Sequence, residues 1–128
     1  MRLLLDTHAL IWWLAGDPAL SANAKAAIHD PGNEVFVSAA SAWEIATKFR
    51  IGRLPDAGML ATDVRGALVN QGFLELPISV QHGQAAGSLP GPHRDPFDRM
   101  LVAQASLADL VLVSNEAVFD RYGVRRLW

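Results

Sequence analysis

Short apolar runs alternate along this chain with longer stretches in which apolar residues recur at helical spacing. The runs predict strands at Arg2–Leu5, Glu34–Val37, Phe73–Leu76, Leu110–Val113 and Val124–Trp128. The stretches between them predict helices at Ala9–Leu14, Ser21–His29, Ser38–Phe49, Ala57–Gln71, Asp95–Leu107 and Asn115–Tyr122. Strands separated by helices favour a parallel sheet covered by helices. We therefore predict an α/β fold, a three-layer αβα sandwich with a small, mainly parallel central sheet.

Length and composition narrow the class of protein. A chain of 128 residues can build one core, so we expect one domain over residues 1–128. There is no cysteine, which excludes disulfides, thiolate metal sites and cysteine nucleophiles. The start of the chain is too polar for a signal peptide, and no apolar run approaches the roughly 20 residues of a membrane span. We expect a cytoplasmic protein with no membrane contact.

Four acidic residues fall where such a fold places its chemistry. Asp6 follows the first predicted strand, and Glu116 closely follows the last strongly apolar one. Glu44 and Asp98 lie in the first turns of two predicted helices. Because ligands bind at the carboxyl ends of parallel strands, we expect the four carboxylates to converge at that edge of the sheet.

A cluster of carboxylates repels itself unless a cation is bound. Oxygen ligands without thiolates point to Mg²⁺ or Mn²⁺. Such ions suit phosphodiester hydrolysis, since they activate water and neutralise charge on the leaving group.

Asp95 differs from these four acids, because the Asp95-Pro96 pair is typical of a helix start and a role as N-cap explains the residue. We assign it a lower-ranked place at the site.

Four blocks of sequence carry a resemblance to a known family. They read DTHALIWWL, SAASAWEIATKFRIG, HRDPFDRMLVAQA and LVLVSNEAVFDRYGV, and the chain ends in RRLW. Together they resemble PIN-domain proteins of the VapC toxin type over essentially the whole chain. The resemblance implies a PIN-like fold and a ribonuclease that depends on Mg²⁺ or Mn²⁺. It further implies the toxin of a toxin–antitoxin pair, commonly a homodimer neutralised by its cognate antitoxin.

The resemblance also implies catalytic and metal-binding roles for Asp6, Glu44, Asp98 and Glu116. Where the family usually has Thr-x-Asp, this chain has Ser114-Asn115-Glu116, which keeps the charge but moves it outward by one methylene. We therefore expect the other three acids to hold the principal ion and Glu116 to contribute weakly. DNA would be contacted only indirectly, through the antitoxin.

Other residues near the acids have supporting roles in this hypothesis. The hydroxyls of Thr7, Ser38 and Ser114 could orient ligands or water, although helix capping explains them equally well. Basic residues that could contact RNA phosphates are Lys48, Arg50, Arg53, Arg94 and Arg99. The net charge of −2 does not oppose RNA binding, since the four site carboxylates account for more than all of it.

Histidine and tryptophan complete the list of candidates. The four histidines have no metal-ligand spacing, and His93 is expected on the surface. Trp12 and Trp13 are adjacent on one predicted helix and cannot both face inward. One of them is therefore a candidate for an antitoxin or dimer groove.

Two other functions stay open from the sequence. The first is a catalytically impaired PIN-like module that binds RNA or protein, suggested by Glu116 in place of Asp. The second is an unrelated Mg²⁺-dependent phosphohydrolase with Asp6 as nucleophile, which is disfavoured because His8 stands where that class has a second Asp.

Overall fold

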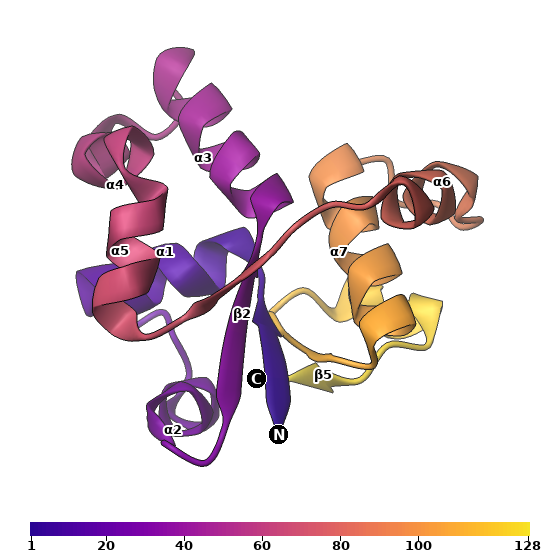
Figure 1. The fold of residues 1–128 in the computed structure, drawn as a ribbon, viewed down its shortest axis with the longest axis horizontal. Helices are drawn as coiled ribbons and strands as arrows, with labels where there is room; N and C mark the ends of the chain where they lie inside the picture. Colours follow the sequence, from indigo (N-terminus) through magenta and orange to yellow (C-terminus); the bar gives the residue numbers. More distant parts are fainter.

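Five parallel strands form one sheet in a computed structural model that describes all residues from 1 to 128. The strands are β1 (Arg2–Leu5), β2 (Glu34–Ser38), β3 (Leu74–Leu76), β4 (Val111–Val113) and β5 (Arg126–Leu127). Their order is β3-β2-β1-β4-β5, so β1 is central, with β2 on one side and β4 on the other. Figure 1 shows β1 and β2 side by side in the middle of the molecule. The predicted α/β fold is confirmed, and the sheet is parallel throughout.

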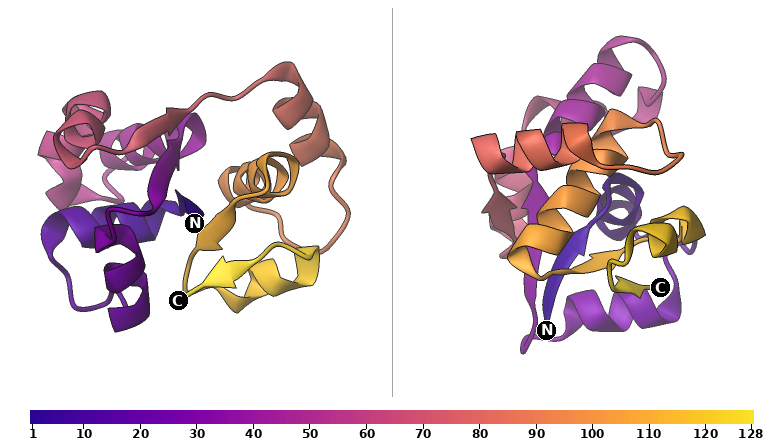
Figure 2. Two further views of the ribbon diagram at one scale, coloured as in Figure 1. Left: turned by 60° about the horizontal axis from the view of Figure 1, so that its bottom comes forward. Right: turned by 90° about the vertical axis from the view of Figure 1, so that its right-hand side faces the viewer.

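Helices cover both faces of this sheet. They are α1 (Thr7–Ala15), α2 (Ala22–His29), α3 (Ala39–Arg50), α4 (Gly58–Thr62), α5 (Val64–Gln71), α6 (Val80–Ser88) and α7 (Pro96–Ala108), with the 3₁₀ helices η1 (Pro55–Ala57) and η2 (Ala117–Tyr122). One face packs against α1, α2, α3 and α5, and the other against α7 and η2. α6 packs on α7 (Figure 2).

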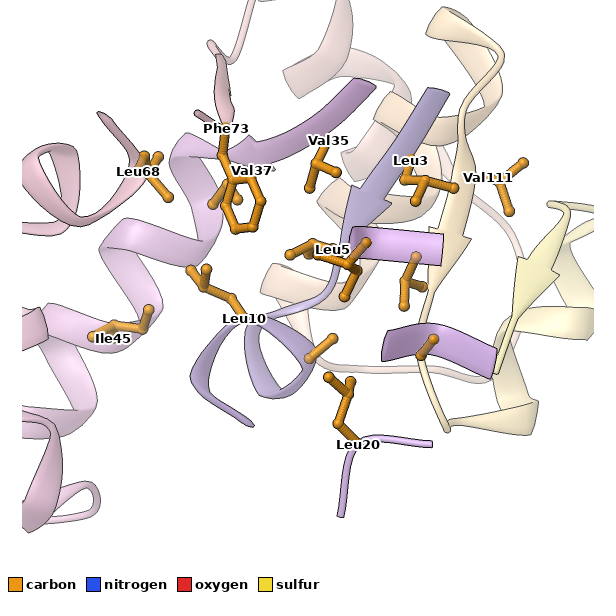
Figure 3. Packing of buried hydrophobic residues seen from close by; sticks show 14 residues of the cluster. Leu3, Leu5, Leu10, Leu20, Val35, Val37, Ile45, Leu68, Phe73 and Val111 are labelled. Atoms are coloured by element: carbon orange, nitrogen blue, oxygen red, sulfur yellow. The ribbon is translucent and has the colours of Figure 1, made fainter. Parts of the chain in front are cut away.

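The leucines of β1 belong to two separate hydrophobic clusters. Leu3 and Leu5 lie in the larger cluster and Leu4 in the smaller one, because successive side chains of a strand point to opposite faces. Figure 3 shows Leu5 and Val37 gathered with Leu10 of α1 on the larger side. A strand buried on both faces requires a continuous apolar run, and that is the pattern at the start of the sequence.

Two segments differ from the sequence-based expectation. The single helix predicted for Ala57–Gln71 is broken into η1, α4 and α5, because Asp63 leaves helical geometry and caps α5 by accepting the Gly66 N–H at 2.9 Å. Helix α6 was not predicted. It contains Gly83 and Gly87 and has one buried residue, Ala86, so it has little apolar periodicity to detect.

The start of α3 was predicted with two alternatives, and the structure selects one. Ser38 is the N-cap, and its hydroxyl accepts the Ala40 N–H at 3.0 Å, whereas Ser41 lies within the helix. Predicted starts at Ser21 and Asp95 are likewise the N-caps of α2 and α7. No helix in the structure has the length and apolar character needed to cross a membrane.

Candidate active site

Asp6 is fixed at the carboxyl end of the central strand. Its N–H donates to the Val113 carbonyl at 3.0 Å, which extends the sheet ladder by one step. Its Oδ1 accepts the Ala9 N–H at 2.8 Å and caps α1. The residue is only 4% exposed, and this burial raises the pKa of its carboxyl, although the Ser114 side chain and the Ala9 N–H oppose the shift.

Asp98 and Glu116 reach the same edge from two helix N-termini. Asp98 lies in the first turn of α7, and Glu116 is the N-cap of η2, with its N–H donating to Ser114 Oγ at 3.0 Å. Burial raises the pKa of Asp98 to about 7, with further contributions from the charges of Asp95 and Glu116. The charge of Glu116 also raises the pKa of Asp6. The charge of Glu116 therefore acts on both buried carboxyls, Asp6 and Asp98.

His93 joins this cluster, contrary to the expectation of a surface residue. Its Nε2 lies 2.7 Å from Asp98 Oδ2, and ligand atoms of His93, Asp98 and Glu116 all lie within 4.8 Å of one another. Sequence reasoning missed this residue because its spacing to Asp98 fits no metal motif on a single helix. The available signal was its place two residues before the Asp95-Pro96 helix start, where the chain turns into α7.

Glu44 is also buried, but a basic side chain neutralises its charge. Its Oε1 accepts from the Thr7 hydroxyl at 2.6 Å, and its Oε2 forms an ion pair with Lys48, one helical turn away. Asp6 and Glu116, in contrast, form no ion pair with any basic side chain. Glu116 thus lies in one group with Asp98, whereas Glu44 already has a cationic partner.

Asp95 and the three hydroxyls have local partners. Asp95 Oδ1 accepts the N–H groups of Phe97 at 2.9 Å and Asp98 at 3.3 Å, as expected for an N-cap. Ser38 caps α3 and also donates to Gln104 Oε1 at 2.6 Å. Thr7 contacts Glu44, whereas Ser114 contacts Glu116, so two of the three hydroxyls touch or orient candidate site acids.

A cleft of about 590 Å³ is lined by Thr7, Glu44 and Asp95, but not by Asp6, Asp98 or Glu116. Its wall includes both acidic and basic side chains, namely Glu44, Asp95, Lys48, Arg53 and Arg94. Arg50 is exposed outside this wall. Arg99 is committed to the fold, because its guanidinium donates to the carbonyls of His93 at 2.8 Å and Ala86 at 3.3 Å. The five predicted RNA contacts are thus divided into three at the cleft and two elsewhere.

The donor set fits a divalent cation. Ligand atoms of His93, Asp98 and Glu116 lie within 4.8 Å of one another, and burial raises the pKa of Asp98 to about 7 even though His93 lowers it. A cation at this position would stabilise the ionised carboxylates and so offset the burial that raises the pKa values of Asp6 and Asp98.

Comparison with known proteins decides the family. A PIN-domain model matches residues 3–125. This chain belongs to the PIN-domain family. Within it, the chain is similar to ribonuclease VapC16 of Mycobacterium tuberculosis, with 38% identity over 73 residues, covering 54% of this chain. The match spans 50% of the length of that relative.

Solved structures of VapC toxins share the fold of this PIN domain. VapBC2 from Rickettsia felis, bound to a promoter DNA fragment, matches with a TM-score of 0.72 and 16% identity, covering 98% of this chain and 97% of that one. VapC20 of Mycobacterium tuberculosis, a sarcin–ricin loop cleaving toxin, matches with a TM-score of 0.69 and 16% identity, covering 95% of each chain. VapBC-1 from nontypeable Haemophilus influenzae matches with a TM-score of 0.68 and 14% identity, covering 98% of this chain and 96% of that one.

Proposed function

We propose that this PIN domain is a metal-dependent endoribonuclease and the toxin of a toxin–antitoxin pair. One observation carries the proposal: Asp6 and Asp98 are buried carboxyls whose pKa values are raised, the charge of Glu116 contributes to both shifts, and their chain neighbours Thr7 and Phe97 line a cleft that also has basic side chains. The similarity to a ribonuclease and the fold shared with VapC toxins support the same activity.

In this proposal Asp6, Asp98 and Glu116 hold Mg²⁺ or Mn²⁺. The ion, when bound, activates a water molecule and neutralises charge on the phosphodiester. The chain prepares this position through its backbone, since Asp6 is fixed by the β4 carbonyl and the α1 cap. Glu44 faces the cleft with Lys48, so this pair orients substrate or water at the edge of the metal site.

RNA would lie along the 590 Å³ cleft, with its phosphates near Lys48, Arg53 and Arg94. Basic side chains supply affinity for phosphates that does not depend on the RNA sequence. The neighbouring carboxylates repel a phosphate unless a cation lies between the two. In this proposal the RNA backbone lies beside the acids.

The antitoxin would occupy an apolar groove that adjoins the cleft. This groove, of about 460 Å³, is lined by Trp12 and by apolar residues of α1, η1 and α4, and it shares Arg53 and Leu54 with the cleft. Trp13 turns away, with its ring against Phe73 and its Nε1 donating to Gln71 at 2.9 Å. Trp12 is therefore the groove residue of the pair. A homodimer in the cytoplasm that contacts DNA only through the antitoxin completes the proposal.

The test is cleavage of a mixed RNA substrate by the purified chain. EDTA should abolish cleavage, and Mg²⁺ or Mn²⁺ should restore it. Asp6→Asn should lose activity while remaining folded. Asp109→Asn, which changes an exposed acid paired with Arg125, is the matched control and should stay active.

Two outcomes would contradict the proposal. Cleavage that persists in excess chelator would exclude the metal mechanism. RNA binding without cleavage under any divalent ion would instead indicate a catalytically impaired binding module. Expression in a bacterial host with and without the adjacent antitoxin gene tests the toxin role separately, since a chain that is harmless alone is not a toxin.

A further inference from the structure

His93 is held at the acidic cluster by three contacts of its own. Its backbone N–H donates to the Tyr122 hydroxyl at 3.0 Å, and its carbonyl accepts from Arg99 Nη1 at 2.8 Å. Its ring stands edge-on to Phe119, with centroids 6.1 Å apart and an interplanar angle of 89°. Phe119 is fully buried, so the imidazole rests against the core. The first two contacts fix the backbone of His93, and the third places its ring against Phe119.

The short helix η2 positions both His93 and Glu116. Glu116 is its N-cap, and Phe119 and Tyr122, which contact His93, lie within it. The loop that carries His93 lies tightly against the same helix. A Cβ at Gly91, where φ is +107°, would come within 2.7 Å of the Tyr122 ring. The two ligand candidates are therefore fixed relative to each other although 23 positions separate them in the chain.

The ring of His93 lies at the acidic group, whereas the ring Nδ1 of His82 accepts from the Ser79 N–H at 3.1 Å, at the start of α6. Its Nε2 faces Asp98 Oδ2 at 2.7 Å, and Glu116 offers an oxygen within the same 4.8 Å group. His8 is the other histidine near the acids, but it is exposed and stacks on Trp12, with ring centroids 5.5 Å apart. His29 lies at the end of α2, which leads into the start of β2 and so to the opposite edge of the sheet.

We propose that His93 is a nitrogen ligand of the metal site, together with Asp98 and Glu116, and that the site consequently binds Mn²⁺ and other first-row transition ions in preference to Mg²⁺. The reason is chemical: Mg²⁺ prefers oxygen ligands throughout, whereas an imidazole nitrogen adds affinity for transition ions. This inference rests on the proposed function, because it assigns a further ligand to the same metal site. It also accounts for the contacts that fix His93, which a solvent-exposed residue would not need.

Pulsed EPR on the Mn²⁺-loaded protein tests the ligand directly, without measuring activity. A coordinated imidazole gives a nitrogen hyperfine coupling, and this coupling should change when histidine is labelled with ¹⁵N. We expect the coupling in the unchanged protein, in His8→Gln and in His29→Gln, and its loss in His93→Gln. Metal titration should show Mn²⁺ binding weakened by about 10- to 100-fold in His93→Gln, with a smaller loss for Mg²⁺. His29→Gln is the matched control, and circular dichroism confirms that each variant folds.

The outcomes separate this inference from the proposed function. Absence of nitrogen coupling in the unchanged protein, or its persistence in His93→Gln, overturns the inference even if the chain cleaves RNA. Nitrogen coupling from His93 in a chain that cleaves no RNA would uphold the ligand and refute the nuclease. If His93→Gln does not fold, the ¹⁵N-labelled unchanged protein and the variants His8→Gln, His29→Gln and His82→Gln still decide. Coupling that survives in all three variants supports His93, and coupling lost in any of them refutes it.

Discussion

Replacing Asp98 by Asn should stabilise the metal-free protein while removing its activity. In the folded protein the Asp98 carboxyl has a pKa of about 7, raised mainly by burial, compared with 3.8 for the ordinary group. The folded state therefore binds a proton that the unfolded chain has already released, and stability falls as the pH rises from about 4 to about 7. Asn carries no charge to bury and keeps the shape of the side chain.

The size of the effect follows from these two pKa values. At about 1.4 kcal/mol per pH unit, they correspond to at most about 4 kcal/mol. The Asp98 side chain is 15% exposed and contacts His93, so we expect a gain of about 1 to 3 kcal/mol at pH 8 in EDTA. Each kcal/mol raises Tm by about 4 °C for a chain of this size.

Thermal unfolding followed by circular dichroism measures this gain. The difference between Asp98→Asn and the unchanged protein should shrink as the pH is lowered towards 4. Mn²⁺ at 1,000 times its Kd should reverse the order, because a ligand at that concentration stabilises the unchanged protein by about 4.1 kcal/mol. Asp120→Asn is the control: Arg126 lowers the pKa of that exposed carboxyl, so its removal should give no gain. An Asp98→Asn protein that is no more stable at pH 8 in EDTA would refute the electrostatic reasoning.

Three further predictions concern the acids and the cleft. Asp95→Ala should cost about 1 kcal/mol through the lost cap of α7, whereas Asp95→Asn should unfold at nearly the same temperature as the unchanged protein. Glu116→Gln should reduce cleavage about as strongly as Asp6→Asn, because Glu116 lies with Asp98. Glu116→Asp should keep activity if the shorter side chain still reaches the ion. Equal loss of activity in both Glu116 variants would show that the longer side chain is required. Arg53→Ala and Arg94→Ala should each lower the slope of log K against log salt for RNA binding by about 1, and an unchanged slope would remove that residue from the interface.

Much of the fold was predictable because its signals are local. The buried run Arg2–Leu5, the Asp95-Pro96 helix start and the strands near Glu34 and Val111 all appear where the sequence placed them. The break at Asp63 was not predictable from periodicity. There a side-chain cap outweighs the helical pattern of Leu60, Val64 and Leu68, and nothing in the spacing signals that competition.

The candidate site was predictable in its members more than in their grouping. Placement at strand ends and helix starts identified Asp6, Asp98 and Glu116, because topology alone brings those positions to one edge. Charge pairing within the group depends on side-chain direction. The Glu44–Lys48 pair has the spacing of one helical turn, yet the sequence could not show that Lys48 turns towards this acid and not towards solvent. His93 depends on the path of a loop, which no periodic pattern encodes.

The central strand β1 connects the hydrophobic core directly to the candidate active site, which limits how the chain can be engineered. The side chains of β1 alternate between two hydrophobic clusters, and the next residue is Asp6, held by the Val113 carbonyl. Inserting or deleting one residue within Leu3–Leu5 would exchange the two faces and withdraw Asp6 from that carbonyl. His93 is carried by a connection outside the sheet. A change of side chain at position 93 would therefore leave the sheet intact, whereas the length of β1 has to be left unchanged.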